Sequence, residues 1–153
     1  YGGRFGLLPI PGLEFGVSAG TSRLAAPGEL PRRSYNVAGA DFAFKRGGFD
    51  LRGEYIQQRV GDLATSAAPQ GGTWKTWYTQ VAYGIPSTKW EPVVRYGDFN
   101  SPHGDQELRQ WGLGLNYWFA PNAVGKIGYE FNRGAQGTMN DNDRLLLQFA
   151  YGF

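Results

Sequence analysis

Apolar and polar residues alternate with a period of two along most of this chain. The clearest case is the last segment, where Arg144 and Gln148 fall between apolar residues. The apolar parity there holds Leu145, Leu147, Phe149, Tyr151 and Phe153. Successive side chains of a β-strand point to opposite faces. The alternation therefore predicts strands with one apolar and one polar face, and helical spacing is hard to find.

Glycine and proline divide this pattern into nine segments. The predicted strands cover residues 2–9, 12–22, 34–46, 49–60, 73–85, 90–100, 108–120, 123–134 and 143–153. No linker or composition change divides the chain. We therefore expect an all-β fold, an antiparallel up-and-down sheet that forms one unit over residues 1–153.

The connections between these strands alternate between short and long. Short turns are expected at Pro9–Gly12, Arg46–Gly48, Pro86–Lys89 and Pro121–Asn122. Long loops rich in Pro, Gly, Ser, Asn and Asp are expected at about 23–33, 61–72, 101–107 and 135–142. Short turns on one rim and long loops on the other are typical of an outer-membrane β-barrel. The expected fold is thus a transmembrane β-barrel.

Aromatic residues concentrate near both predicted rims. Near the short turns are Tyr83, Trp90, Phe119, Tyr151 and Phe153. Near the long loops are Trp74, Trp77, Tyr96, Trp111 and Phe131. Two aromatic girdles mark the two interfaces of a membrane barrel. The simpler interpretation is that aromatic residues favour strands in general.

Composition excludes several classes. The 153 residues include no cysteine, which argues against a disulfide-stapled scaffold. With 16% aromatic residues and a net charge of +2, the chain fits neither a disordered protein nor a strongly basic nucleic-acid binder. No apolar run is long enough for a transmembrane helix. A mean hydropathy of −0.42 is compatible with a barrel, which presents only every second residue to lipid.

Several segments carry a resemblance to a known family. They are Trp90–Tyr96, Gly112–Asn122, Lys126–Phe131 and the terminal run Leu145–Phe153. These resemble the C-terminal hairpins of Gram-negative porins, and in particular the phosphate-selective porin O and P family. The resemblance implies a passive channel for ions or small solutes with a preference for anions or phosphate. It also implies a homotrimer in contact with outer-membrane lipid and lipopolysaccharide.

Both the resemblance and the number of predicted strands indicate whether this chain makes a whole barrel. The resemblance implies that Phe149, Tyr151 and Phe153 form the signal read by the barrel assembly machinery, with a periplasmic C-terminus in the bacterial outer membrane. Family members have about sixteen strands, and bacterial barrels have an even number. Nine strands thus predict the C-terminal part of a larger barrel, whose N-terminal strands would be partners of this segment.

The alternation assigns the two faces of the predicted barrel wall. The polar parity is expected to line the pore through Arg4, Glu14, Asp41, Arg52, Glu54, Arg95, Lys126, Glu130 and Arg144. The apolar parity is expected to face lipid through Trp77, Tyr83, Trp111, Leu113, Leu115, Tyr117, Ile127, Tyr129, Leu145, Leu147, Phe149 and Tyr151. For most charges the simpler interpretation is a wall of cross-strand ion pairs.

Candidate chemistry is sparse. His103 is the only histidine, and a triad with Ser101 and Asp105 would lack a rigid scaffold. The acidic run Asp141–Asp143 lacks the central glycine and the distal glutamate of the helical calcium loop. The sequence therefore predicts no catalytic residue, no metal and no cofactor.

Two other functions remain open at this stage. A small complete barrel acting as an anchor or adhesin would require pairing between the first and last strands. A soluble β-barrel that binds an apolar ligand would instead turn its apolar face inward. In that case Trp111, Leu113, Leu115, Leu145, Leu147 and Phe149 would be buried.

Overall fold

A computed structural model describes residues 1–24, 33–62, 70–103, 106–134 and 142–152. The fold is all-β with nine strands. Their bounds are β1 Gly2–Ile10, β2 Leu13–Leu24, β3 Arg33–Arg46, β4 Phe49–Val60, β5 Gly72–Tyr83, β6 Trp90–Asn100, β7 Leu108–Ala120, β8 Ala123–Gly134 and β9 Arg144–Tyr151. These bounds lie within about two residues of the predicted segments. No helix in the described ranges is long and apolar enough to cross a membrane.

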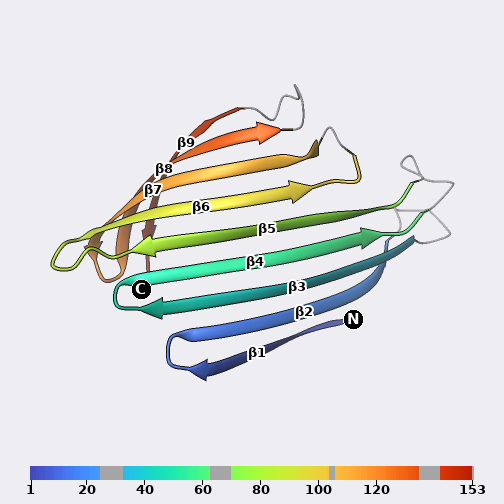
Figure 1. The fold of residues 1–153 in the computed structure, drawn as a ribbon, viewed down its shortest axis with the longest axis horizontal. Helices are drawn as coiled ribbons and strands as arrows, with labels where there is room; N and C mark the ends of the chain where they lie inside the picture. Colours follow the sequence, from blue (N-terminus) through green and yellow to red (C-terminus); the bar gives the residue numbers. More distant parts are fainter. Residues whose placement is uncertain (25–32, 63–69, 104–105, 135–141, 153) are drawn as a thin grey trace.

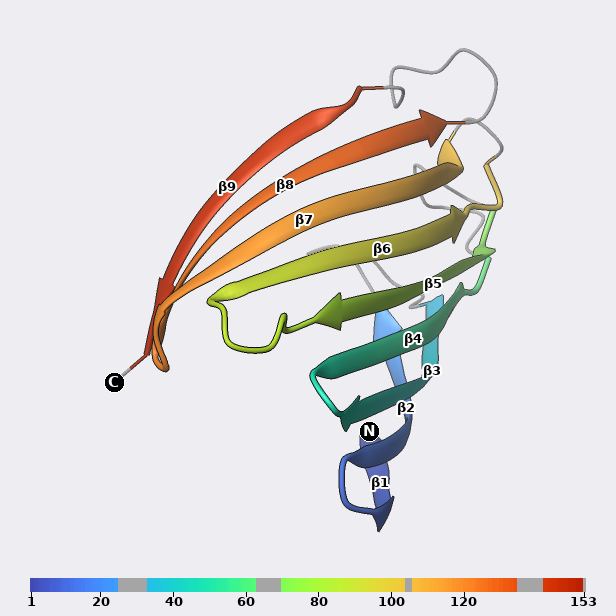
Figure 2. The same cartoon turned by 60° about the vertical axis from the view of Figure 1, so that its left-hand side comes forward.

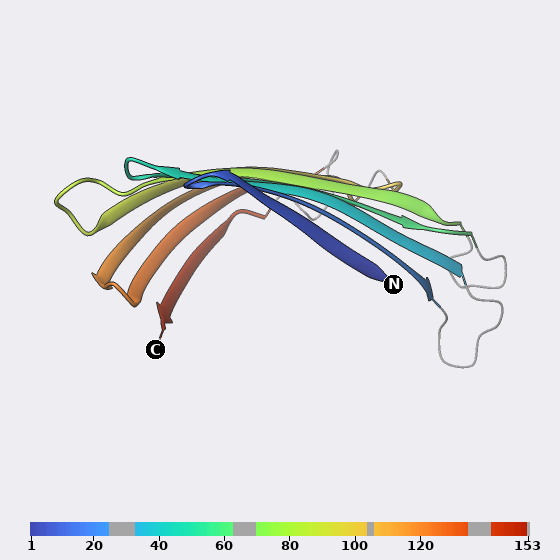
Figure 3. The ribbon, with the colours of Figure 1, turned by 90° about the horizontal axis from the view of Figure 1, so that it is seen from below.

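The strands form one antiparallel meander in which each strand pairs with its neighbours in sequence (Figure 1). The sheet is open, since the described residues of β1 and β9 do not pair with each other. A closed seam, which the small-barrel alternative requires, is thus not present in this part of the chain. The sheet also arches, and both termini lie on the same side of the arch (Figures 2 and 3).

Glycines allow the tight turns between strands. Gly47 and Gly48 both have positive φ, at 57° and 87°, between β3 and β4. Two successive residues of positive φ are what a type I′ hairpin turn requires, which explains the short connection. Between β5 and β6 the chain leaves the ladder after Tyr83, two residues earlier than predicted. Gly84 bonds to the Gly48 carbonyl and Ile85 bonds to the Trp90 carbonyl, so both belong to the connection.

The sheet is a single layer without a hydrophobic core. Among the described residues, the buried apolar side chains are Ala82, Ala123 and Val124, none of them large. The chain exposes 10747 Å² of surface. A compact monomer of 16.9 kDa would expose about 7,700 Å². About 3,000 Å² of additional surface is therefore uncovered, and it includes most of the large apolar side chains.

Candidate functional site

The strand register separates the two faces of the sheet. Directly opposite residues of an antiparallel pair share a face. The polar face is defined by rows such as Arg52, Gln80, Arg95, Gly112 and Glu130, which stand opposite one another from β4 to β8. By this register, all nine residues predicted to line a pore lie on the polar face.

The opposite, apolar face carries all twelve residues predicted to face lipid. Its side chains are uncovered: Leu147 is 76% exposed, Phe149 67% and Trp111 52%. The soluble-barrel alternative required these residues to be buried, and in the described structure they are not. Whether the two faces border lipid and a pore stays a prediction.

The polar face is the concave side of the arch. A hollow of about 240 Å³ is lined by residues of five strands, from Gln80 on β5 to Gln148 on β9, and its charged and amide side chains belong to the polar face. Near the other edge, side chains from β1 and β3 meet above β2. From Arg33 to Ala40 and from Leu108 to Leu115, the polar-face residues are also less exposed than the apolar-face residues between them, as expected on the inner side of a curved sheet. This is the side that faces the lumen when a sheet closes into a barrel.

Two ion-pair groups occupy the β1–β4 half of the polar face. Arg4 Nη2 lies 2.7 Å from Asp41 Oδ1 and 3.3 Å from Glu14 Oε1. Farther along, Asp50 accepts bonds from Arg52, at 2.7 Å, and from Lys45, at 3.0 Å. Lys45 and Asp50 stand opposite each other on β3 and β4, whereas Arg52 reaches along its own strand. The pairs of Arg4 and Lys45 cross between strands, as the simpler interpretation expects, whereas the Arg52–Asp50 pair lies within β4.

Charges in the β5–β9 half are arranged differently. The Arg95 guanidinium lies 4.0 Å from the centre of the Tyr78 ring, a cation–π contact. No carboxylate in the described part of the chain lies within ion-pair distance of Arg95, Lys126 or Arg144. Glu91 accepts a hydrogen bond from the Asn116 amide at 2.7 Å. This half thus carries cations that no acid neutralises in the described structure.

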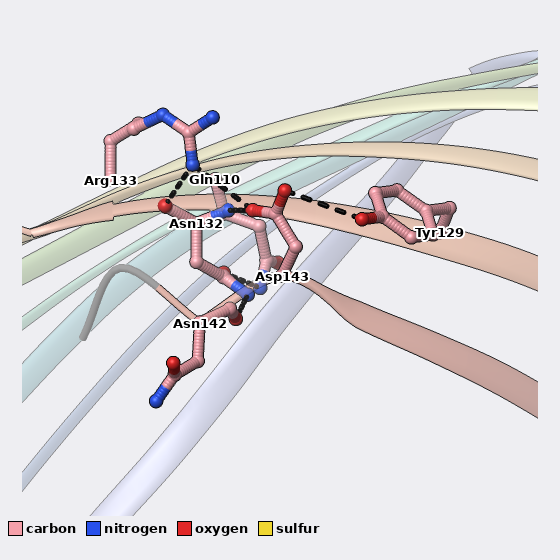
Figure 4. Close-up of polar contacts among 6 residues, drawn as sticks. All are labelled: Gln110, Tyr129, Asn132, Arg133, Asn142 and Asp143. Atoms are coloured by element: carbon pink, nitrogen blue, oxygen red, sulfur yellow. Dashed lines mark hydrogen bonds and ion pairs between the residues drawn. The ribbon is translucent and has the colours of Figure 1, made fainter. Parts of the chain in front are cut away.

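A polar cluster fixes the open end of the β8–β9 hairpin (Figure 4). Asp143 accepts bonds from the Asn132 backbone N–H at 3.1 Å, the Arg133 guanidinium at 3.0 Å and the Tyr129 hydroxyl at 3.3 Å. The buried Asn132 side chain bonds to Gln110 and to the Asn142 carbonyl. The Asn132 N–H bond is the main cause of an Asp143 pKa below its usual range, and the Arg133 bond lowers that pKa further.

Aromatic side chains form two rows on the apolar face. At the long-loop end, Trp77, Tyr96 and Trp111 are in contact, with ring centroids 5.3 and 4.8 Å apart. At the short-turn end lie Phe49 with Tyr83, then the series Trp90, Tyr117, Phe119 and Phe149. Trp74 departs from the predicted girdle: it stands opposite Gln58, on the polar face. Its distance from Trp77 is an odd number of residues, so the two side chains lie on opposite faces.

Near the long loops, the apolar face ends at a boundary of charged and amide side chains. This boundary is inclined to the rows of directly opposite residues. Counting from the middle of each strand toward the long loops, the first charged or amide side chain of this face moves progressively across the sheet. It is Asn36 on β3, then Gln57, Lys75, Asp98, Arg109, Arg133 and finally Asp143 before β9. The β8–β9 ladder ends at the pair Glu130 and Arg144, and the row one residue beyond it, from Asp143 through Phe131, reaches β3 at Phe42, six residues from Asn36.

The six-residue offset between Phe42 and Asn36 gives the inclination of this boundary to the rows of opposite residues. Six residues of about 3.4 Å rise, set against six interstrand spacings of about 4.8 Å, correspond to a slope of about 35°. Strands of transmembrane barrels are tilted by about 35–45°. The polar boundary of the apolar face would therefore lie parallel to a membrane surface if these strands were tilted in that way.

Little else on the chain is arranged for chemistry. His103 lies beside Trp74, with ring centroids 6.1 Å apart, and its backbone N–H bonds to Ser101. Asp105 and Asp141 fall outside the described residues, as does Phe153 of the predicted assembly signal. No group of three His, Asp or Glu side chains in the described ranges is placed to hold a metal ion.

Sequence reasoning missed two features of the site. One is the Asn132–Asp143 cluster, which depends on the end of a hairpin ladder and leaves no periodic signal. The other is the hollow, whose floor consists of Gly112, Gly114 and Gly128. Glycines at alternate positions of facing strands were a usable signal for it. Compared with known proteins, the sequence matches no protein-family model and no curated protein.

Proposed function

We propose that this chain forms part of the wall of a β-barrel channel in a bacterial outer membrane. Its apolar face would contact lipid and its concave polar face would line an aqueous pore. Such a channel acts by passive diffusion of ions and small solutes, and the porin resemblance adds anions and phosphate as a preferred class. The short turns and the C-terminus would then be periplasmic.

The observation that carries this proposal is the exposed apolar face of a layer that buries no core. About 3,000 Å² of excess surface is costly in water, at roughly 25 cal/mol for each Å² that is apolar. Lipid on the convex side removes this cost and leaves the polar face to water. A soluble fold would have to cover the same face with further protein.

The inclined boundary and the two aromatic rows support the same proposal. The polar boundary slopes by about 35° to the rows of opposite residues, which run across the strands, and this angle is close to the strand tilt of transmembrane barrels. The rows through Trp77 and Trp90 lie at opposite ends of the apolar face. Tryptophan and tyrosine favour the membrane–water interface, where one end of the ring is apolar and the other is hydrated.

The open edges require partners within the membrane. Each backbone group left without a hydrogen bond in lipid costs several kcal/mol. The free edges of β1 and β9 would pair with further strands that complete the barrel. Contact with a second and third copy as a homotrimer, and with lipopolysaccharide, belongs to the same proposal.

Heat-modifiable migration tests this function. The protein that carries this chain, together with the strands that complete its barrel, is folded in detergent micelles and run on SDS gels with and without boiling. We expect the unboiled sample to migrate as a compact species and the boiled sample at its full mass, because a closed hydrogen-bonded barrel resists SDS at ambient temperature. Identical migration, together with high solubility in detergent-free buffer, would contradict the proposal.

A further inference from the structure

The hollow on the polar face has a floor without side chains. Gly112 and Gly114 on β7 and Gly128 on β8 leave the backbone bare at the centre of the sheet. A Cβ at Gly112 would meet its nearest neighbour, the Arg95 Cβ, at an ordinary 3.6 Å. Packing therefore does not require glycine there. The glycines instead leave a volume of about 240 Å³, the space of about eight water molecules.

Charges of both signs surround this floor. Arg95 on β6 and Glu130 on β8 stand in one row, on either side of Gly112. Their strands are two spacings apart, or about 10 Å. Lys126 lies on β8, four residues before Glu130. None of these three side chains forms an ion pair with a described residue. Two cations and one anion thus line one volume and form no ion pair with one another.

Neighbouring contacts hold part of this arrangement in place. The Arg95 guanidinium packs against the face of the Tyr78 ring. Glu91 accepts a bond from the Asn116 amide, which fixes a second lining side chain. Gln80 and Gln148 add amides that both donate and accept hydrogen bonds. A ligand here would meet two cations, one carboxylate and several amides.

We propose that this hollow is a binding subsite for an acidic amino acid, a solute with two carboxylates and one ammonium group. The inference rests on the proposed function, in which the polar face borders the pore. The two carboxylates complement Arg95 and Lys126, and the ammonium group complements Glu130. The ten heavy atoms of glutamate are of a size that the hollow accepts.

The test compares glutamate with glutarate, which has the same carbon chain and carboxylates but no ammonium group. Binding to the same barrel protein in micelles is measured by calorimetry and by ligand-observed NMR, so no measurement of conductance is needed. We expect glutamate to bind more tightly than glutarate. The change Glu130→Gln should weaken glutamate binding about fivefold and leave glutarate equal or tighter.

Further variants distinguish the effect of the lining charges on ligand binding from the effect of the hollow's volume. Arg95→Gln and Lys126→Gln should weaken both ligands, and Gly112→Ala should weaken both by filling the floor. Glu54→Gln makes the same charge change on the polar face but outside the hollow, and should change neither affinity. Equal binding of glutamate and glutarate, or insensitivity to Glu130→Gln, would overturn the amino-acid assignment.

A gel assay on the same samples distinguishes failure of the subsite from failure of the proposed channel function. Each variant is first run on SDS gels with and without boiling. Heat-modifiable protein that binds neither ligand would refute the subsite while leaving the channel proposal intact. Protein that is not heat-modifiable would refute the channel itself.

Discussion

Arg4 and Asp41 form an ion pair, with 2.7 Å between Nη2 and Oδ1, although strand β2 lies between their strands. The contact passes over Gly16, the residue of β2 that stands opposite Asp41. A Cβ at Gly16 would lie 2.5 Å from the Arg4 guanidinium and 2.5 Å from the Asp41 carboxylate. The glycine therefore makes the contact possible, and the contact ties the edge strand β1 to β3.

The change Gly16→Ala should displace this ion pair and loosen β1. We expect a small but measurable fall in the urea concentration at the unfolding midpoint, because both charges are partly exposed. Gly6→Ala is the matched control, since a Cβ there meets Arg4 at an ordinary 3.7 Å. Equal midpoints for the two variants would show that the Arg4–Asp41 contact does not hold β1.

Two adjacent leucines test the assignment of the faces. Leu147 lies on the apolar face of β9 and Leu146 on the polar face. In a membrane, Leu147→Arg should destabilise the folded protein by about 2–4 kcal/mol, the cost of arginine near the bilayer midplane. Leu146→Arg should cost much less, because its side chain faces water. Unfolding in lipid bilayers measures both values, and similar costs would argue against lipid on the apolar face.

Two tryptophans test the same faces by fluorescence. Variants that keep only Trp77 or only Trp74 are placed in vesicles of brominated lipid. Bromine should quench Trp77, which lies on the apolar face, much more strongly than Trp74, which lies on the polar face beside His103. Equal quenching of the two would contradict the orientation proposed for the sheet.

The Asn132–Asp143 cluster predicts a pH dependence at the end of β8. The pKa of Asp143 is lowered in the folded state, chiefly by the bond from the Asn132 N–H. Its contribution to stability is therefore complete above the unfolded pKa of about 3.9 and is lost as the pH falls through the lower folded value. Exchange of the Asn132 amide hydrogen should accelerate in that acidic range.

The variant Asp143→Asn isolates the carboxylate. Its Asn132 amide should exchange faster than that of the original chain at neutral pH and should show little further acceleration on acidification. A pH dependence that persists unchanged in Asp143→Asn would assign the effect to another group.

Much of the fold could be predicted because strand periodicity is a local property. Leu145 and Arg144 face opposite ways for steric reasons that involve only their own backbone. Glycine and proline mark the ends of most strands in the same local way. Strand β5 shows the limit of prediction from local pattern. Its end at Tyr83 depends on hydrogen bonds from Gly84 and Ile85 to other segments.

The sequence by itself determined nine strands, their alternating faces and the separation of charge from apolar surface, since each follows from neighbouring residues. The tertiary structure alone decided which residues meet across strands. The register brings Arg4 near Asp41, leaves Arg95 and Glu130 apart across Gly112, and inclines the apolar boundary by about 35° to the rows of opposite residues. Register arises from pairing between distant segments, so no local pattern specifies it.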